Sequence, residues 1–318
     1  MRVLVTGATG FVGRWLIREL QAAGHRPIPT PGRLQLDITD ERGVTRFVSA
    51  ARADAIAHLA GVSHAGEASR DPAHAFAVNE GGTRAVIRAV VSHGRLIPVL
   101  VTGSGEVYGR PEPADLPLRE EAPLHAKHVY ALSKLAQEQA ALELGSLNDV
   151  PVIVTRSFNH TGPGQGRDFV APALAYRVLE AKRLGRPDVA VGNLEVRRDI
   201  GDVRDVVRAY RLLLEGLASG GVPSGAVVNV ATGSAVTIRW VLEALARTAG
   251  IAVRPMIDPS LVREDDPPVM VGDPGRLRAF TGWAPVIPLE QTLADLFEGL
   301  EHGQAGGFSP SIRAVPSD

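Results

Sequence analysis

Three glycines near the start of the chain limit the choice of fold more than any other feature. Gly7, Gly10 and Gly13 follow a strand-like run at residues 3–6 and lead into a helical pattern at residues 11–23, in the order T-G-A-T-G-F-V-G. Glycine suits a tight turn, a close approach of the backbone to a pyrophosphate, and close packing of a helix on a strand. The first N–H groups of such a helix receive the phosphates. The spacing therefore predicts a strand–turn–helix unit that binds a dinucleotide cofactor.

Strand-like and helical runs continue to alternate through the first half of the chain. Strand-like runs at residues 55–59, 97–102 and 152–155 are separated by helical patterns at residues 72–92 and 129–144. This alternation predicts a parallel sheet with crossover helices. We expect a Rossmann-type, doubly wound α/β unit, and we expect the last of these runs to be its sixth strand.

The rhythm changes after residue 158, which predicts a second, smaller α/β domain. A Gly-rich loop and helical patterns follow, and the strand-like run at residues 226–231 is expected to return to the first sheet. The expected domains are residues 1–158 with 200–232 for the dinucleotide and 159–199 with 233–302 for the substrate. The Gly-, Pro- and Ser-rich stretch 303–318 is expected to be a flexible tail.

Composition excludes several classes of partner and site. Lys and Arg number 34 and Asp and Glu 35, so the formal charge of -1 gives no global field that would recruit nucleic acid. Cys 0 excludes a thiolate zinc site and a cysteine nucleophile, and no metal site is expected. No apolar run reaches the ~18 residues of a membrane span, and the N-terminus lacks a secretory pattern. We expect a cytoplasmic protein without a membrane partner.

A tyrosine and a lysine at helical spacing form the expected catalytic pair. Tyr130 and Lys134 are four residues apart in Y-x-x-x-K, so both project from one helix face. An ordinary phenol has a pKa near ~10, and a nearby cation lowers it. Ser104 is expected just after the fifth strand, at the carboxyl edge of the sheet where ligands bind. The alternative is a half-buried aromatic residue beside a solvated lysine.

The segment after the first helix bears on the choice of cofactor. Prolines at positions 27, 29 and 31 remove backbone donors, so the second strand, at residues 26–30, is expected to be short or distorted. The acidic residue that would bind the ribose 2′-hydroxyl of NAD is absent from residues 25–34. Arg33 could face a 2′-phosphate or be a solvated loop residue. Asp37 could reach the adenine edge or cap the helix that follows Asp40.

Several sequence motifs of the chain resemble those of the extended short-chain dehydrogenase/reductases. The resemblance rests on TGATGFVG, HLAG at 58–61, Asn79 with Gly82-Thr83, Ser104, and YALSK at 130–134. Within that superfamily, the segments SFNHTGPGQ at 157–165 and VGNLEVRRDIGDVRD at 191–205, together with residues 263–266, are most similar to GDP-4-dehydro-6-deoxy-mannose reductases and GDP-mannose 4,6-dehydratases. The resemblance covers nearly the whole chain.

The resemblance implies a reaction and roles for the catalytic residues. Bound NADPH or NADH would deliver hydride to C4 of a GDP-linked 4-keto-6-deoxyhexose, while Tyr130 donates a proton to the C4 oxygen. Ser104 would hydrogen-bond that oxygen, and Lys134 would contact the nicotinamide ribose and lower the Tyr130 pKa. Glu106 matches the position of the dehydratase glutamate that moves a proton at C5. Its alternative role is a hydrogen-bonding loop carboxylate.

The resemblance also implies two sets of binding residues. The cofactor set is Gly7, Thr9, Gly10, Phe11, Val12, Gly13, Arg33, Asp37, Ile38, Leu59, Ala60, Gly61, Asn79, Tyr130 and Lys134. The substrate set is Ser63, Ser104, Asn159, Arg183, Arg198, Arg263 and Asp266. Guanidinium groups suit a diphosphate, although each arginine could instead form a surface ion pair, such as Arg198 with Asp199. His64 is expected either in the sugar pocket or facing solvent.

Two glycines depart from the family pattern and bear on the choice among three functions. Gly61 stands where a second Ala is usual, and Gly105 stands where a Ser commonly follows the catalytic Ser or Thr, which argues against dehydratase activity. The reductase competes with a dehydratase or epimerase that retains its cofactor, and with a non-catalytic nucleotide sensor.

Helices at 72–92 and 129–144 carry apolar residues on more than one face, which together with the resemblance predicts a homodimer.

Overall fold

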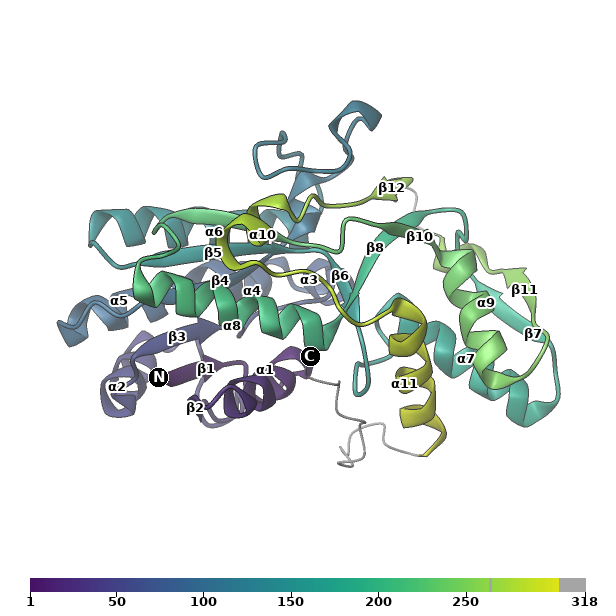
Figure 1. The fold of residues 1–318 in the computed structure, drawn as a ribbon, viewed down its shortest axis with the longest axis horizontal. Coiled ribbons are helices and arrows are strands. Elements are labelled where there is room, and N and C mark those ends of the chain that lie inside the picture. The colour runs from purple at the N-terminus through teal and green to yellow at the C-terminus, as the bar shows by residue number, and fades with distance from the viewer. Residues whose placement is uncertain (263–264, 303–318) are drawn as a thin grey trace.

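The computed structural model describes residues 1–262 and 265–302 of the chain. It has a larger layered part, on the left in Figure 1, and a smaller part of helices and short strands on the right. The segment between the fourth strand and the following long helix projects from the larger part at the top of Figure 1. Among the residues described, no helix combines the length and apolar character needed to cross a membrane.

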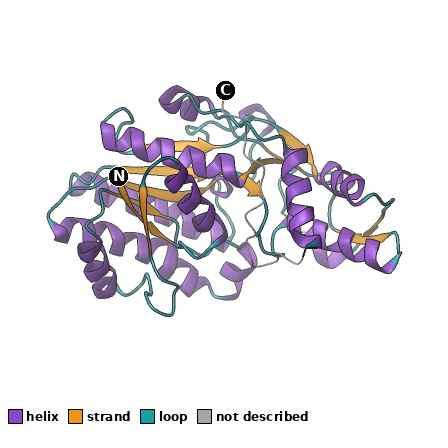
Figure 2. Ribbon diagram, turned by 60° about the horizontal axis from the view of Figure 1, so that its bottom comes forward, coloured by secondary structure: helices purple, strands orange, loops and turns teal. Residues whose placement is uncertain are grey.

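The larger part is built on a six-stranded parallel sheet with the order β2-β1-β3-β4-β5-β9. Helices cover both faces of the sheet, as Figure 2 shows, so the fold is a doubly wound α/β fold as expected. The strands are β1 Arg2–Thr6, β2 Arg26–Pro29, β3 Ala55–His58, β4 Val99–Ser104, β5 Val152–Ser157 and β9 Ala226–Val230.

Each face of the sheet has its own apolar core. On one face, Leu4 and Ile56 pack with Val44, Val86 and residues of the long sixth helix. On the other, Val3 and Val5 pack with residues of the first and eighth helices. The covering helices are α1 Phe11–Ala22, α2 Glu41–Ala51, α3 Ala65–Arg70, α4 Pro72–Phe76, α5 Gly82–His93, α6 Val129–Leu147, α8 Val203–Ser219 and α10 Gly275–Thr281.

The expected strand count was wrong by one. The structure has no strand between β2 and β3, so β4 with Ser104 is the fourth strand and β5 is the fifth. The sixth strand is β9, which pairs with β5 in parallel, and this confirms the return of residues 226–231 to the first sheet. No residues had been assigned to the missing strand, and the segment between β2 and β3 contains turns and α2.

The prolines of β2 are compatible with a regular but short edge strand. Arg26 N–H donates to Met1 O at 2.8 Å and Thr30 N–H donates to Val5 O at 2.9 Å. Alternate residues of a strand point their N–H groups in the same direction, so the nitrogens of Pro27 and Pro29 face away from β1. Because β2 lies at the edge of the sheet, no ladder bond is lost.

The single helix expected at residues 72–92 is interrupted. A π-helical turn at Ala77–Gly81 separates α4 from α5. Such turns insert one extra residue into a helix and are frequent at functional sites. Here the turn contains Asn79, whose buried amide bonds Val62 and Ser133. The irregular turn therefore anchors the start of α5 to the loop after β3.

The smaller part encloses a third apolar core formed mainly by α7 Val170–Leu184, α9 Ile238–Ala249 and α11 Leu289–Glu301. Strands β7 Asp188–Val191 and β11 Arg254–Ile257 pair beside them. Strand β8 Arg197–Asp202 pairs with β10 Ala235–Thr237, β12 Val269–Met270 and β6 Asn159–Thr161. Short 3-10 helices occur at Gly105–Tyr108, Pro113–Asp115 and Pro259–Leu261. The domain boundary proposed at residue 200 falls within β8.

Candidate active site

A cavity of about 1050 Å³ opens at the carboxyl ends of the sheet strands and extends to the smaller part. Thr6, Leu59 and Thr102, at or just after the ends of β1 and β3 and within β4, line one side of it. Phe169, which precedes α7, and Met270, which ends β12, also line it. Ligands of open α/β sheets bind at this edge, so the cavity is the candidate site.

The glycine-rich turn forms one wall of the cavity. Gly7 has φ +68°, and a Cβ there would stand 2.8 Å from the Ala60 nitrogen. A Cβ on Gly13 would stand 2.2 Å from the Gly7 oxygen, so side chains are excluded by backbone contacts. Gly10 precedes α1 without a side-chain cap, which leaves the first N–H groups of the helix to a ligand. This geometry fits a dinucleotide pyrophosphate.

Most of the expected cofactor residues line this cavity. Ten of them lie along the turn, α1 and the loops after β2 and β3: Gly7, Thr9, Gly10, Phe11, Val12, Gly13, Ile38, Leu59, Ala60 and Gly61. Arg33, Asp37, Tyr130 and Lys134 also line it. Asn79 is fully buried and is not among the lining residues. Its hydrogen bonds hold the loop after β3, so it supports the wall from behind.

Ser104, Tyr130 and Lys134 come together at the cavity wall. Ser104 ends β4, and Tyr130 and Lys134 occupy successive turns of α6. The Ser104 hydroxyl lies close enough to the Tyr130 phenol to influence its pKa. The helix begins at this point because the His128 ring nitrogen accepts the Ala131 N–H at 3.3 Å. The three side chains that the sequence suggested are therefore neighbours.

The electrostatics of Tyr130 differ from the expectation. Burial and the charge of Glu106 raise the pKa of the Tyr130 phenol, and the nearby Ser104 hydroxyl only partly opposes this. Lys134 does not lower that pKa here, because its ammonium donates instead to Thr102 O at 3.1 Å and Gln137 Oε1 at 2.8 Å. Burial lowers the pKa of Lys134 to about 8. Tyr130 is therefore a protonated acid at neutral pH in this arrangement.

Glu106 lies in the 3-10 helix after Ser104 and pairs with a histidine that sequence reasoning did not single out. The Glu106 Oε2 to His128 Nε2 distance is 2.9 Å, and both side chains are partly exposed. The His128 ring is parallel to the Tyr130 ring, with centroids 6.2 Å apart. His128 precedes Tyr130 by two residues at the helix N-cap, which was the available signal.

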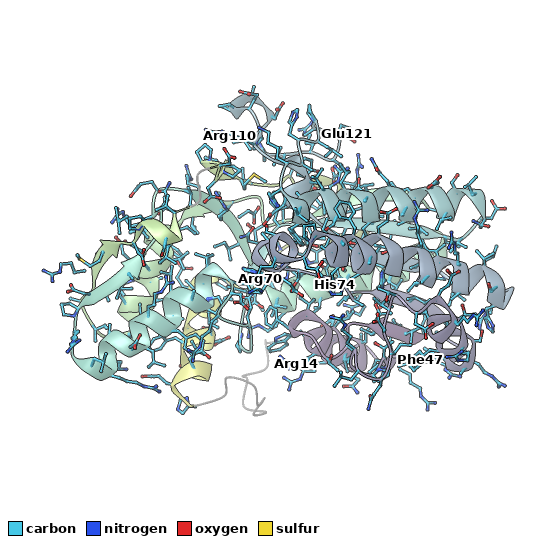
Figure 3. All side chains as sticks on the ribbon, turned by 180° about the vertical axis from the view of Figure 1, so that it is seen from behind. Arg14, Phe47, Arg70, His74, Arg110 and Glu121 are labelled. Atoms are coloured by element: carbon cyan, nitrogen blue, oxygen red, sulfur yellow. The ribbon has the colours of Figure 1, made fainter. Side chains whose placement is uncertain are left out.

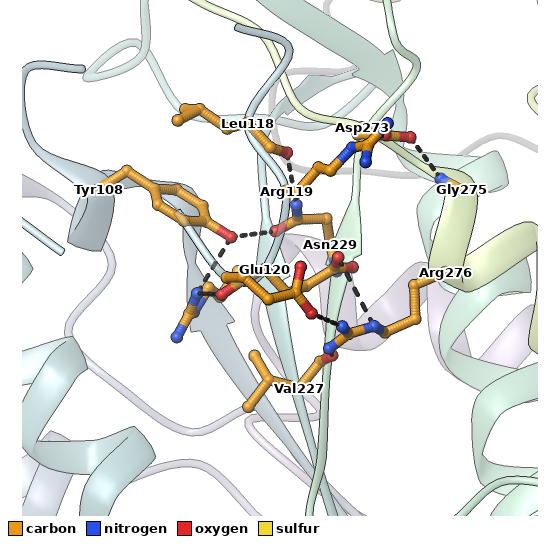
Figure 4. Close-up of polar contacts among 11 residues, drawn as sticks. Tyr108, Leu118, Arg119, Glu120, Val227, Asn229, Asp273, Gly275 and Arg276 are labelled. Carbon is orange, nitrogen blue, oxygen red and sulfur yellow. Dashed lines mark hydrogen bonds and ion pairs between the residues drawn. The ribbon is translucent and has the colours of Figure 1, made fainter. Parts of the chain in front are cut away.

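Hydrogen bonds to β9 hold the segment that follows Glu106 in place, as Figure 4 shows. The Tyr108 hydroxyl donates to Asn229 Oδ1 at 2.8 Å, and Asn229 Nδ2 donates to Leu118 O at 2.8 Å. The Glu120 carboxylate accepts the Asn229 N–H at 2.8 Å. The expected polar connection at 103–128 is therefore anchored, and it contributes Arg110, His125, Lys127 and His128 to the cavity.

Arg33, Asp37 and His74 gather at the end of the cavity expected to hold the adenosine. Arg33 Nη1 lies 3.1 Å from His74 Nε2, and Figure 3 labels His74 near the junction of the two parts. Asp37 Oδ1 accepts the Thr39 N–H at 2.9 Å and the Thr39 hydroxyl at 2.8 Å. These bonds, with Arg33 and His74, lower the Asp37 pKa. Asp40, not Asp37, occupies the N-cap position of α2, so the capping alternative for Asp37 was wrong.

The expected substrate residues are only partly brought together. Ser63, His64, Asn159, Arg198 and Asp266 line the cavity. The Arg198 guanidinium donates to Asp266 Oδ1 at 2.6 Å and to two backbone carbonyls, so its ion-pair partner is Asp266 and not Asp199. Arg183 is exposed in the last turn of α7 and does not line the cavity. Arg263 lies outside the described residues.

The fold and this site define an enzyme of the short-chain dehydrogenase/reductase class, with a glycine-rich dinucleotide turn facing a serine, a tyrosine and a lysine. Residues 3–231 match the model of the NAD dependent epimerase/dehydratase family, and the chain belongs to that family. Within residues 1–262 and 265–302, no group of three or more His, Cys, Asp or Glu side chains could hold a metal ion.

One relative and two solved structures show what the chain resembles. GDP-6-deoxy-D-mannose reductase of Pseudomonas aeruginosa is 38% identical over 94% of this chain and 97% of its own. The structure of RMD from Pseudomonas aeruginosa complexed with NADPH is 35% identical, with TM-score 0.86 over 95% of this chain and 99% of that one. The Thermus thermophilus UDP-glucose 4-epimerase complex with NAD is 27% identical, with TM-score 0.82 over 97% and 100% of the two chains.

Proposed function

We propose that the protein reduces the C4 ketone of a GDP-linked 4-keto-6-deoxyhexose with NAD(P)H, giving GDP-rhamnose or its C4 epimer. The observation that carries this proposal is the 38% identity to a GDP-6-deoxy-D-mannose reductase over nearly the whole of both chains. The convergence of Ser104, Tyr130 and Lys134 on a cavity large enough for two nucleotides supports it. The proposal includes a cytoplasmic location and a homodimer. Exposed Val91, Leu132 and Leu147 on α5 and α6 support the homodimer.

The residues act by binding, orienting and transferring one proton. A reduced dinucleotide with its pyrophosphate at the glycine-rich turn would supply hydride to C4. Ser104 hydrogen-bonds the carbonyl oxygen, and Tyr130 transfers its phenolic proton to the same oxygen as the charge on it grows. Lys134 would donate its remaining N–H to the nicotinamide ribose. Holding acid, hydride source and ketone in one geometry removes the entropic cost of a bimolecular encounter.

Two features of the site favour reduction over dehydration. The raised pKa of Tyr130 keeps the phenol protonated, as a proton donor in reduction must be, whereas oxidation of a carbinol begins with proton removal. A Cβ at Gly105 would lie 3.2 Å from the Phe158 ring, so the serine common at this position requires the ring to move. The competing proposal is a GDP-mannose 4,6-dehydratase or epimerase with retained cofactor, in which Glu106 moves a proton at C5.

The deciding experiment follows NADPH and NADH consumption with GDP-4-keto-6-deoxy-mannose made in place by a separate dehydratase. A parallel reaction contains GDP-mannose and NADP⁺ alone. Consumption of reduced cofactor with the keto sugar supports the reductase. Formation of the keto sugar from GDP-mannose makes the dehydratase the better proposal, and nicotinamide absorbance retained through purification points the same way. No reaction in either arm favours the non-catalytic sensor.

We propose NADPH as the preferred cofactor, with Arg33 near its 2′-phosphate. Arg33→Ala is expected to raise the KM for NADPH about 10-fold or more, because a charge-assisted phosphate contact is lost. The KM for NADH, which has no 2′-phosphate, is expected to change less than about twofold. Steady-state kinetics with both cofactors measure this, with exposed Arg42→Ala as the control. An equal rise for both cofactors would contradict the assignment of Arg33.

Arg198 is proposed to serve the sugar nucleotide by holding the wall of its pocket. Arg198→Ala removes the bonds to Asp266 and the Pro267 carbonyl and leaves the Asp266 carboxylate facing the cavity. The KM for the keto sugar nucleotide is expected to rise about 10-fold, with the cofactor KM little changed. Exposed Arg197→Ala, one residue away, is the matched control. Equal changes in both KM values would place Arg198 outside the substrate site.

A further inference from the structure

A chain of buried hydrogen bonds runs beneath the cavity from the glycine-rich turn to Lys134. It passes through Thr6 on β1, His58 on β3, Thr83 on α5 and Gln137 on α6. All four of these side chains are at most 2% exposed. The roles derived above use Lys134 but assign nothing to Gln137, Thr83 or His58. Gln137 follows Lys134 by three residues, which places both on one face of α6.

The donors and acceptors along this chain can be assigned from the Thr83 end. The Thr83 hydroxyl donates its single proton to Asn79 O at 2.8 Å. Its lone pairs therefore accept from Gln137 Nε2 at 3.0 Å and from His58 Nε2 at 3.0 Å. With its amide nitrogen committed to Thr83, Gln137 presents its carbonyl oxygen to Lys134. The orientation of the amide is thus determined by its partners.

The assignment from the other end agrees. Thr6 Oγ1 accepts the N–H groups of Leu59 and Ala60, both at 3.1 Å, so its own proton goes to His58 Nδ1 at 2.7 Å. His58 is then a neutral imidazole with its proton on Nε2. Burial and the charge of Lys134 lower the His58 pKa to about 3, which is consistent with a neutral ring. Along this path of hydrogen bonds, from Thr6 to Lys134, every polar side-chain atom has a partner.

The ammonium of Lys134 is confined by this arrangement. It donates to Gln137 Oε1 and to the Thr102 carbonyl, which leaves its third N–H for the cavity that Lys134 lines. On another side lies Gly61, where a Cβ would stand 3.2 Å from the Lys134 nitrogen and 2.8 Å from Asn79 Oδ1. A glycine at position 61 therefore leaves the space that the ammonium and the Asn79 amide occupy.

We propose that Gln137 is a positioning residue that holds the Lys134 ammonium at the cavity wall and couples it, through Thr83 and His58, to the Thr6 hydroxyl beneath the glycine-rich turn. The proposal rests on the proposed function insofar as Lys134 serves the reaction. It predicts that Gln137 controls both the position and the charge state of the Lys134 ammonium. Replacing a glutamine with a purely structural role would leave the Lys134 titration unchanged.

The protonation of Lys134 can be read directly because the chain has three lysines, Lys127, Lys134 and Lys182. Protein labelled with ¹³C and ¹⁵N in lysine gives three side-chain NMR signals to titrate, assigned with Lys127→Arg and Lys182→Arg. In the wild type the Lys134 charge is lost as the pH rises through about 8. The experiment needs no substrate, so it is independent of the proposed reaction.

Two substitutions at Gln137 are expected to move this titration in opposite directions. Gln137→Leu removes an acceptor from a buried cation, so the Lys134 pKa falls by about one unit. Gln137→Glu, which keeps the side-chain shape, places a carboxylate beside the ammonium and raises the pKa by about one unit or more. Exposed Gln139→Leu and Gln139→Glu on the same helix are the matched controls and leave the titration unchanged.

The high-pH limb of kcat/KM for the reduction is expected to follow the NMR titration, moving to lower pH in Gln137→Leu and to higher pH in Gln137→Glu. A Lys134 titration that stays in place in Gln137→Glu, or moves the same way in both variants, overturns the proposal. If Gln137→Leu does not fold, the isosteric Gln137→Glu decides alone. NMR shifts in the expected directions with no reduction of any keto sugar would uphold the positioning role and contradict the proposed function.

Discussion

Tyr130→Phe is expected to reduce turnover of the keto sugar nucleotide by about 10²–10⁴-fold, because it removes the proton-donating hydroxyl and no other group. In the proposed reaction the phenol is the acid that protonates the C4 oxygen, and burial and the charge of Glu106 raise its pKa so that it stays protonated. The ring is retained, so its packing in the apolar core on this face of the sheet is preserved. Steady-state kcat measures the loss, and fluorescence titration with NADPH is expected to give a Kd within about threefold of wild type.

Tyr108→Phe is the matched control, since Tyr108 is also buried and lies two residues from Glu106. It loses the hydrogen bonds with Asn229 and Arg156 but no group in the proposed chemistry. Wild-type turnover in Tyr130→Phe, or equal losses in the two variants, would remove Tyr130 from the role of acid.

Glu138→Gln is expected to lower the free energy of unfolding by about 3–5 kcal/mol, because it leaves a buried guanidinium without its counter-charge. Glu138 follows Gln137 on α6 and accepts from Arg156 of β5 through two bonds, Nε to Oε2 at 2.9 Å and Nη2 to Oε1 at 2.6 Å. The side chains are 5% and 6% exposed. Glutamine has the same shape but presents an amide N–H to the guanidinium donors.

Urea denaturation followed by circular dichroism measures this loss. Glu143→Gln is the matched control, since Glu143 lies on the same helix and its pair with Arg84 is exposed and 3.6 Å long. Exposed pairs contribute about 0–1 kcal/mol, so that variant is expected to unfold close to wild type. Equal stability of the two variants would show that the buried pair is compensated by its other contacts, which include the Tyr108 hydroxyl and the Glu120 carbonyl.

The parts of the site that follow from short-range patterns were predicted well. The turn at Gly7, Gly10 and Gly13 follows from a strand, three glycines and a helix that are contiguous in the chain. Tyr130 and Lys134 share a helix face because a helix repeats every 3.6 residues, and their neighbour Ser104 follows from the carboxyl-edge rule. Each of these inferences requires only local geometry or the topology of a parallel sheet.

The wrong expectations concern partners that are distant in the chain. Lys134 was expected to act on Tyr130, but Thr102 and Gln137 accept from its ammonium. Arg183 was expected to bind substrate because of its charge, yet it is exposed in the last turn of α7 and does not line the cavity. Six strands were expected up to residues 152–155, but the segment between β2 and β3 contains turns and α2 and no strand.

The sequence alone therefore determined the fold class, the dinucleotide turn and the Ser–Tyr–Lys constellation, since these depend on periodicity and on residue types at fixed spacing. Only the tertiary structure decided the protonation of Tyr130, the partner of Arg198 and the buried path from Thr6 to Gln137. Charge states and hydrogen-bond partners depend on burial and on distances between strands and helices. Those quantities exist only once the sheet and its covering helices have packed together.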